Sequence, residues 1–189
     1  MKEVTLQVPD GKKVEWREVN GVTVPVLIDE QKQDNRPVTE RIKTFEDALD
    51  KLGDDNFLVK EYWKVVNVDI ELSADIIAVL KLRIIAAALN EGWEPKFTTD
   101  EYRYYPWFTL YTQEEIDAMD EEEKSRVVGR SNYNSYAYAG VAFSLAGSAS
   151  SVSVTIYGGR LCFKTRALAE YAGEQFLQEW ADFMLWQEK

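Results

Sequence analysis

The sequence has no histidine and only one cysteine, Cys162, among its 189 residues. The lack of histidine excludes Ser-His and Cys-His nucleophile pairs, histidine metal sites and the usual general base near neutral pH. A single cysteine forms neither an internal disulfide nor a four-cysteine zinc site, and between two apolar neighbours it is typical of a small buried hydrophobic residue. We therefore expect no catalytic, metal-binding or cofactor-binding residues and a protein that is not an enzyme. Carboxylate chemistry is the one enzymatic route that remains open.

Long hydrophobic runs are also absent. The longest uninterrupted apolar run covers the six residues from Ile84 to Leu89, whereas a membrane-spanning helix needs about 20. The first residues, MKEVTLQVPDGKK, lack the apolar core of a signal peptide. We expect a soluble protein, located in a bacterial cytoplasm or inside a particle, with no membrane partner.

Positive charge is scarce, because 33 acidic residues outnumber 22 basic ones and the net charge is −11. Broad binding to nucleic acid requires Lys and Arg to displace counterions, so this composition argues against it. The acidic excess either aids solubility or imitates nucleic acid toward a basic partner. Apolar residues make up 46% of the chain and aromatic residues 13%, which is enough to form the core of a folded domain.

The N-terminal residues 1–29 predict a three-stranded β-meander, which stands as a small subdomain or adds to the main sheet. Its strands are expected at 4–8, 14–19 and 22–28, and Asn20-Gly21 is a strong hairpin signal. The polar segment 30–40 contains a proline and predicts a linker. The main domain then covers 41–189.

Capping residues indicate the first helices of the main domain. Thr44 precedes a short helix that Gly53 ends, and Ser73 precedes a long helix over 74–90. Apolar residues occur almost all around the long helix, which is typical of a buried core element. The segment 60–68 fits a strand or a helix equally well.

Two further helices follow threonine caps. Thr112 begins a capping box and a helix to about 126, whose acidic residues predict a solvated surface rather than a cation site. Thr165 precedes the last helix, over 165–186, which carries a wide apolar stripe. The stripe is spaced by four residues, and its two largest members, Phe176 and Trp180, should be largely buried; the full set is Leu168, Ala172, Phe176, Trp180 and Met184.

No charged residue occurs between Arg130 and Arg160. Strands are expected at 136–145 and 152–157, joined by a turn at 146–148, with a further strand ending at 161–163. Without gatekeeper charges, this hairpin is either buried within the fold or lies at an interface with a partner or another subunit. The fold class we predict is α+β, with an antiparallel sheet from 102–163 packed against the long helix and the C-terminal amphipathic helix.

An aromatic run from Tyr102 to Tyr111 supplies the first candidate binding residues. Alternation places Tyr104, Pro106 and Phe108 on one face of a strand, with Tyr105 and Trp107 on the other. Such aromatics either fill the core or present a stacking and docking face. The candidate binding residues in this run are Tyr102, Tyr105 and Trp107.

Arg160, Lys164 and Arg166 form the one compact basic cluster in the sequence. They surround the start of the last helix, whose free amides attract anions, so a small anion such as a phosphate group is a candidate ligand. The alternative is that Arg166 pairs with Glu170 one turn later and that Lys164 is solvated.

Five blocks resemble a group of small uncharacterised proteins from phages, prophages and mobile elements of Bacteroidetes: RIKTFEDA from Arg41, AALNEGWEP from Ala87, YYPWF from Tyr104, RLCFKTR from Arg160 and AEYAG from Ala169. The resemblance spans about 41–185. It implies a phage or mobile-element origin and carries no activity and no functional residues with it.

Three functions are compatible with these observations. We favour a non-enzymatic accessory protein of a phage or mobile element that binds another protein or self-associates. The alternatives are a structural component of a virion, with the uncharged strands at subunit contacts, and an enzyme that uses carboxylates.

Overall fold

The computed structural model describes residues 7–19, 21–29, 34–96, 98–129, 140–150 and 160–185. It divides the chain into two compact units, Met1–Arg36 and Pro37–Lys189. The boundary falls inside the segment 30–40 that the sequence indicates as a linker. Among the described residues, none of the helices combines the length and the apolar character that a membrane crossing requires.

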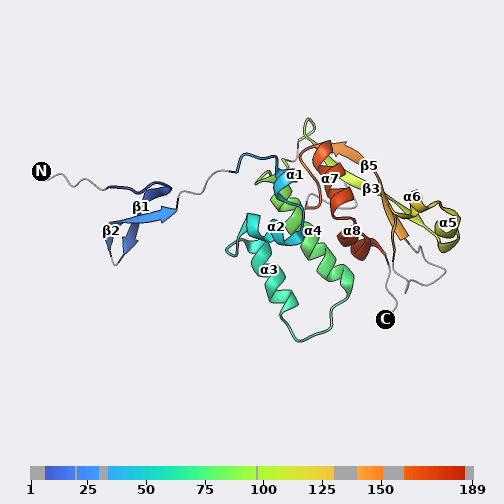
Figure 1. Cartoon of the computed structure of the whole chain (residues 1–189), viewed down its shortest axis with the longest axis horizontal. Coiled ribbons are helices and arrows are strands. Elements are labelled where there is room, and N and C mark those ends of the chain that lie inside the picture. Colours follow the sequence, from blue (N-terminus) through green and yellow to red (C-terminus); the bar gives the residue numbers. More distant parts are fainter. Residues whose placement is uncertain are drawn as a thin grey trace, which may run out of the picture. The chain divides into compact units, whose positions relative to one another are not determined.

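The N-terminal unit is a hairpin of β1 (Lys12–Val19) and β2 (Val22–Asp29), which pair in antiparallel register with Val19 opposite Val22 (Figure 1). Gly21 adopts a φ of 78°, as the tight turn requires. Pro25 lies in β2 and faces Trp16 of β1. The expected strand at 4–8 lies mostly outside the described residues, and its described part, Gln7 and Val8, is not in a strand.

The second unit begins with three helices: α1 (Val38–Arg41), α2 (Phe45–Leu52) and α3 (Phe57–Val66). Thr44 and Asp47 form a capping box at the start of α2, and Gly53 ends it, as the sequence predicts. The ambiguous segment 60–68 is helical for most of its length, as part of α3.

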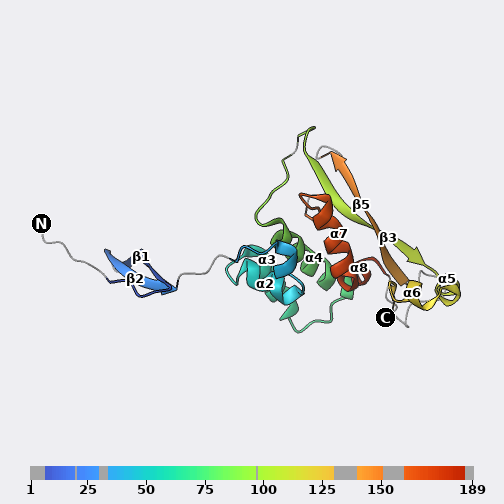
Figure 2. The ribbon, with the colours of Figure 1, turned by 45° about the horizontal axis from the view of Figure 1, so that its top comes forward.

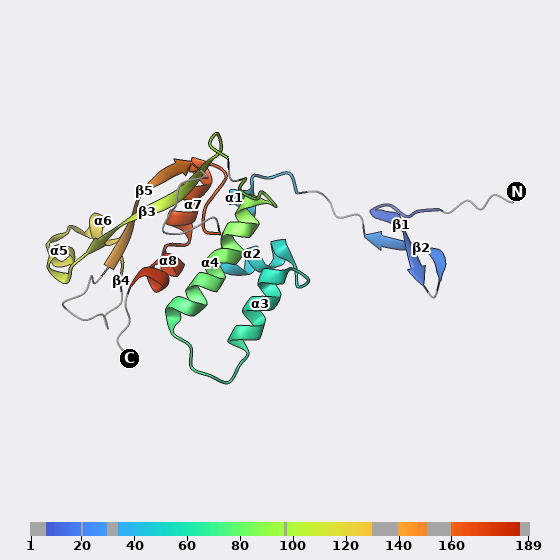
Figure 3. The same ribbon diagram turned by 180° about the vertical axis from the view of Figure 1, so that it is seen from behind.

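The long helix α4 (Ala74–Asn90) is the element that the sequence predicts at 74–90. Ser73 occupies its N-cap position but makes no side-chain capping bond. The C-terminal half of α4 is the buried part, from Leu82 to Asn90, whereas Ile76 near its start is 42% exposed. Figure 3 shows α3 and α4 side by side, joined by the loop 67–73.

A three-stranded antiparallel sheet with the order β3-β5-β4 completes the architecture. Its strands are β3 (Tyr102–Tyr111), β5 (Gly140–Ser150) and the two-residue β4 (Val128–Gly129). Two C-terminal helices, α7 (Arg166–Gln175) and α8 (Leu177–Met184), lie between the sheet and α4 (Figure 2). The predicted α+β class, with an antiparallel sheet, a long helix and a C-terminal amphipathic helix, is confirmed, and the sheet packs on the C-terminal helices, which in turn pack on α4.

The apolar core lies among α2, α4, α7 and α8 and extends to the inner face of the sheet at Ala146. Phe176 and Trp180 are 2% and 1% exposed, so their predicted burial is confirmed, whereas Met184 at the end of the stripe is half-buried. The last helix is not continuous, however, because Phe176 leaves helical geometry, with φ −111° and ψ 33°, and divides it into α7 and α8.

Two other predicted elements differ from the structure. The acidic helix expected from Thr112 to about 126 is two short helices, α5 (Gln113–Ala118) and α6 (Glu121–Lys124). Met119 between them is extended, with ψ 152°, and Asp120 begins a second capping box with Glu123. A second set of start signals inside the acidic run therefore ends the first helix early.

The prediction of a turn at 146–148 is wrong. These residues lie inside β5, paired with Pro106, Tyr105 and Tyr104 of β3. The predicted strand at 136–145 is described only from Gly140, and the one at 152–157 lies outside the described residues. The strand expected to end at 161–163 is a single bridge between Phe163 and Tyr104.

Candidate functional site

The β3–β5 pair has two unlike faces, as the alternation of the aromatic run predicts. The inner face packs on α7, where Gly173 lies so close that a β-carbon on it would be 2.8 Å from Pro106 and would overlap the ring of Phe143. On the same face, the ring of Phe108 lies 5.3 Å from that of Trp180. The inner face of β3 therefore packs against the core through Tyr104, Pro106 and Phe108.

Pro106 is tolerated within β3 because of its place in the hydrogen-bonding pattern. The amide and carbonyl of Tyr104 bond to Phe163, on the edge of β3 away from β5. Backbone groups alternate along a strand, so the nitrogen of Pro106 also faces that edge and its missing proton costs no ladder bond.

The outer face presents a half-exposed apolar pair. Trp107 of β3 lies directly opposite Leu145 of β5, and these side chains are 50% and 53% exposed. The register shifts immediately afterwards, so that Phe108 faces Phe143 and Ser144 is the extra residue of a β-bulge. The bulge keeps Phe143 on the inner face while Leu145 remains on the outer one.

Gly147 gives the indole of Trp107 its position. A β-carbon at Gly147 would overlap that indole and would lie 2.8 Å from the ring of Tyr105. The two rings are 6.2 Å apart at an angle of 48°. Trp107 and Tyr105 therefore extend across the bare backbone of β5, which explains why glycine occupies the middle of this strand.

At the start of β5, away from Trp107 and Leu145, the helix α5 covers the outer face of the sheet. A β-carbon at Gly140 would lie 2.9 Å from Cδ1 of Ile116, so α5 packs directly on the start of β5. The segment 113–124, which contains α5 and α6, is otherwise mostly polar and carries seven acidic residues: Glu114, Glu115, Asp117, Asp120, Glu121, Glu122 and Glu123. An apolar patch, which we define as Tyr105, Trp107 and Leu145, thus shares one face of the sheet with an acidic surface.

Tyr102, the remaining candidate of the aromatic run, is 56% exposed at the far end of β3, opposite Ser150. Alternation assigns it to the inner-face set, beyond the part of the sheet that α7 covers. The structure therefore groups Tyr105 and Trp107 and leaves Tyr102 outside the patch.

The basic cluster of the sequence is largely occupied by contacts within the protein. The guanidinium of Arg166 donates a hydrogen bond to the carbonyl of Ala146 and lies 5.8 Å from the ring centre of Tyr104. The ammonium of Lys164 lies 3.7 Å from Oε2 of Glu91. Arg160 is exposed. Arg166 thus contacts the sheet, and Lys164 contacts the end of α4.

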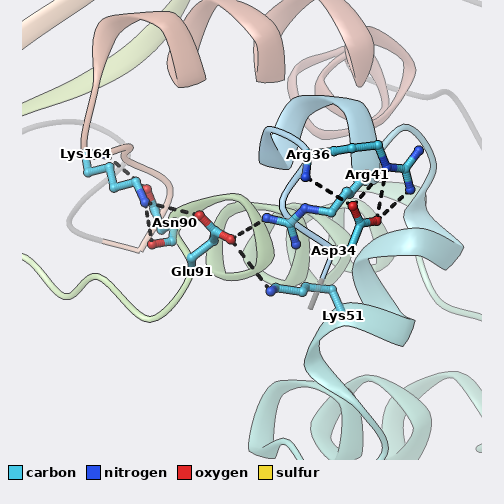
Figure 4. A network of polar contacts seen from close by, with 7 residues as sticks. All are labelled: Asp34, Arg36, Arg41, Lys51, Asn90, Glu91 and Lys164. Atoms are coloured by element: carbon cyan, nitrogen blue, oxygen red, sulfur yellow. Dashed lines mark hydrogen bonds and ion pairs between the residues drawn. The ribbon is translucent and has the colours of Figure 1, made fainter. Parts of the chain in front are cut away.

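The carboxylate of Glu91 forms ion pairs with three basic side chains from three parts of the chain (Figure 4). Its carboxylate lies 2.6 Å from Arg41, 3.7 Å from Lys51 and 3.7 Å from Lys164. The hydrogen bond from Arg41, with the charges of all three cations, lowers the pKa of Glu91 against the opposing effect of burial. The cluster joins α1 and α2 to the end of α4 and the start of α7.

The buried side chain of Asn90 forms hydrogen bonds at the same junction. Its side chain is 6% exposed, donates to the carbonyl of Cys162 at 2.8 Å and accepts from the amide of Lys164 at 3.0 Å. In the sequence, Asn90 and Glu91 stand out only as the end of the predicted long helix and as part of the block AALNEGWEP. The burial of Asn90 and the partners of Glu91 depend on residues far away in the sequence, so no local signal indicates this junction.

Cys162 is 2% exposed. Burial raises the pKa of its thiol above the ordinary value, and the positive charge of Arg103 opposes that shift only in part. A buried neutral thiol is a poor nucleophile. Among the described residues, no group of acidic residues and cysteine is arranged to hold a metal ion.

Comparison with known proteins found no family model, no curated protein and no solved structure that matches this chain.

Proposed function

We propose that this protein is a non-enzymatic accessory protein of a phage or mobile element that binds another protein through the outer face of β3 and β5. The observation that carries the proposal is the cross-strand pair of Trp107 and Leu145, each about half exposed at 50% and 53%. A tryptophan near the centre of an apolar patch is typical of the residues that dominate binding energy at protein interfaces. The resemblance to phage and mobile-element proteins supports the biological setting.

The patch has the rigidity that a docking surface needs. Trp107 is held across Gly147 and beside Tyr105, on strands that are fixed from below by α7. Because Trp107 already packs against Gly147 and Tyr105, less of its conformational entropy is lost when a partner covers it.

The charges around the patch indicate the chemistry of the partner. The acidic helices α5 and α6 lie at the start of β5, where Ile116 of α5 packs on Gly140, and the two basic residues at their end, Lys124 and Arg126, already pair with Glu121 and Glu122. A complementary partner therefore has apolar side chains at its centre and Lys or Arg at its rim. A second copy of this chain fits less well, since it would bring like acidic charges together.

The test is an affinity capture from bacterial host lysate with three forms of the protein: the parent, W107S/L145S and F57S. Phe57 is a suitable control because its side chain is 72% exposed on α3, away from the sheet. We expect a partner that binds the parent and F57S but is lost with W107S/L145S. Circular dichroism melts of the variants check that all of them are folded.

Salt and mass measurements complete the test. Binding through this patch should weaken as ionic strength rises, because salt screens the acidic rim. Equal capture by the parent and by W107S/L145S would contradict the proposal. A dimer in light scattering that only W107S/L145S dissociates would assign the patch to self-association instead.

A further inference from the structure

A shallow pocket lies where α2 ends and the chain turns into α3. Its volume is about 410 Å³, and it is lined by Leu49, Asp50, Gly53, Asp54 and Trp63. The pocket is built only from the α2–α3 corner, so it is separate from the sheet face and does not depend on the function proposed above.

The indole of Trp63 forms an aromatic wall of this pocket. It is 43% exposed and packs edge-to-face on Tyr62, with ring centres 5.0 Å apart. Tyr62 is in turn 8% exposed and lies 5.1 Å from the ring of Phe45. The buried neighbours hold the indole in place while one side of it faces the pocket.

The pocket is also electrically negative. The carboxylates of Asp50 and Asp54 line it, while two lysines nearby in the sequence pair with other acids: Lys51 lies 3.7 Å from Glu91, and Lys60 lies 2.9 Å from Asp55. Gly53 is the C-cap of α2, so the carbonyl groups of the last turn add the negative end of the helix dipole.

Two acids at the C-terminal end of a helix repel its dipole, and a cation at that position would relieve the repulsion. An indole beside them favours a cation that is flat and weakly hydrated. Guanidinium stacks on aromatic rings and donates paired hydrogen bonds to carboxylates, which a compact ammonium group does less well.

We propose that this pocket binds a guanidinium group, with Trp63 stacking on its plane and Asp50 and Asp54 accepting its hydrogen bonds. The same chemistry is supplied by a small free guanidine compound or by an arginine side chain of a protein segment.

The probes for the test are N-acetyl-arginine amide, N-acetyl-lysine amide and the tripeptide Gly-Arg-Gly with blocked ends. Binding is followed by the NMR resonance of the Trp63 indole N–H, which is assigned by its disappearance in Trp63→Phe. We expect a saturable shift with the arginine amide and a weaker response to the lysine amide. A tripeptide that binds more tightly than the amide points to a protein segment, and equal binding points to a free compound.

Charge variants decide the question. The double variant D50N/D54N should bind the arginine amide about fivefold or more weakly. The matched control is Asp55→Asn, because Asp55 is an exposed neighbouring acid that pairs with Lys60 and does not line the pocket. Both changes are at exposed positions, and circular dichroism checks that the variants stay folded. The proposal is overturned by a shift that never saturates, or by equal binding to D50N/D54N and D55N.

Discussion

The carboxylate of Glu91 accepts a 2.6 Å hydrogen bond from the guanidinium of Arg41, although 50 residues separate the two in the sequence. Glu91 also has a φ of 51°, which places it in the left-handed region that non-glycine residues rarely adopt. The contact therefore compensates for a backbone conformation that is unfavourable by itself.

Replacement of Glu91 by glutamine tests this contact through pH. The pKa of Glu91 is lowered from an ordinary value of 4.5, so its charged form is favoured by folding. The resulting stability is present above the unfolded pKa and is lost as the pH falls through the lowered folded pKa. We expect E91Q to unfold about 1 kcal/mol more easily than the parent at neutral pH.

That difference should shrink as the pH falls from 4.5, where Glu91 becomes protonated in the unfolded chain, through its lowered pKa in the folded protein, where the charge of the parent is lost as well. Urea unfolding at several pH values measures it. An E91Q defect of the same size at acidic and neutral pH would show that lost packing, rather than lost charge, is responsible.

Replacement of Trp180 by alanine should be among the most damaging single changes. Its side chain is 1% exposed, and its indole N–H donates to the carbonyl of Ala172 at 3.2 Å. Loss of a buried tryptophan costs about 3–5 kcal/mol. Thermal melts should show a large fall for W180A and almost none for W16A, since Trp16 is 64% exposed in the hairpin. A small change in W180A would mean that α8 is not docked as described.

Replacement of Gly173 by alanine should destabilise the protein, which reverses the usual effect in a helix. Alanine normally stabilises a helix interior by about 1 kcal/mol relative to glycine. Here a β-carbon would overlap Phe143 and crowd Pro106, and such overpacking costs about 1–3 kcal/mol. Denaturant midpoints for G173A and for Glu174→Ala, an exposed control in the same helix, measure the difference. An increase in stability for G173A would contradict the close contact between α7 and the sheet.

Cys162 should react slowly with thiol reagents in the native protein. Its side chain is buried, and the raised pKa keeps the thiol protonated near neutral pH. Labelling with iodoacetamide, followed by intact mass, should be slow in buffer and fast in denaturant. Rapid native labelling would show that the segment before α7 opens readily.

Local signals predicted much of the fold. Caps act within three or four residues, so Thr44, Thr112 and Thr165 were sufficient to place three helix starts. The same locality explains the division of the acidic helix, because Asp120 and Glu123 repeat the capping pattern inside it. That second pattern was present in the sequence but was masked by the continuous run of acids.

The errors arose where distant residues decide the conformation. Gly147 is a residue type that is common in turns. It lies in a strand, however, because Trp107 of β3 packs across it. The contacts of Glu91 come from residues far away in the sequence on both sides, so no local pattern could reveal them. Of the candidate site, the alternation of Tyr105 and Trp107 was predictable, whereas their partner Leu145 depended on a register that only the fold defines.

The hydrogen bond from Arg166 to Ala146 also bears on how the chain avoids aggregation while it folds. The uncharged strand β5 carries no charge of its own to discourage pairing with other chains. The carbonyl of Ala146 faces away from β3, and the charge beside it comes from α7, which is synthesised later. During synthesis β5 therefore emerges before Arg166, whose guanidinium binds the carbonyl of Ala146. In that interval the chain is most prone to aggregate through β5.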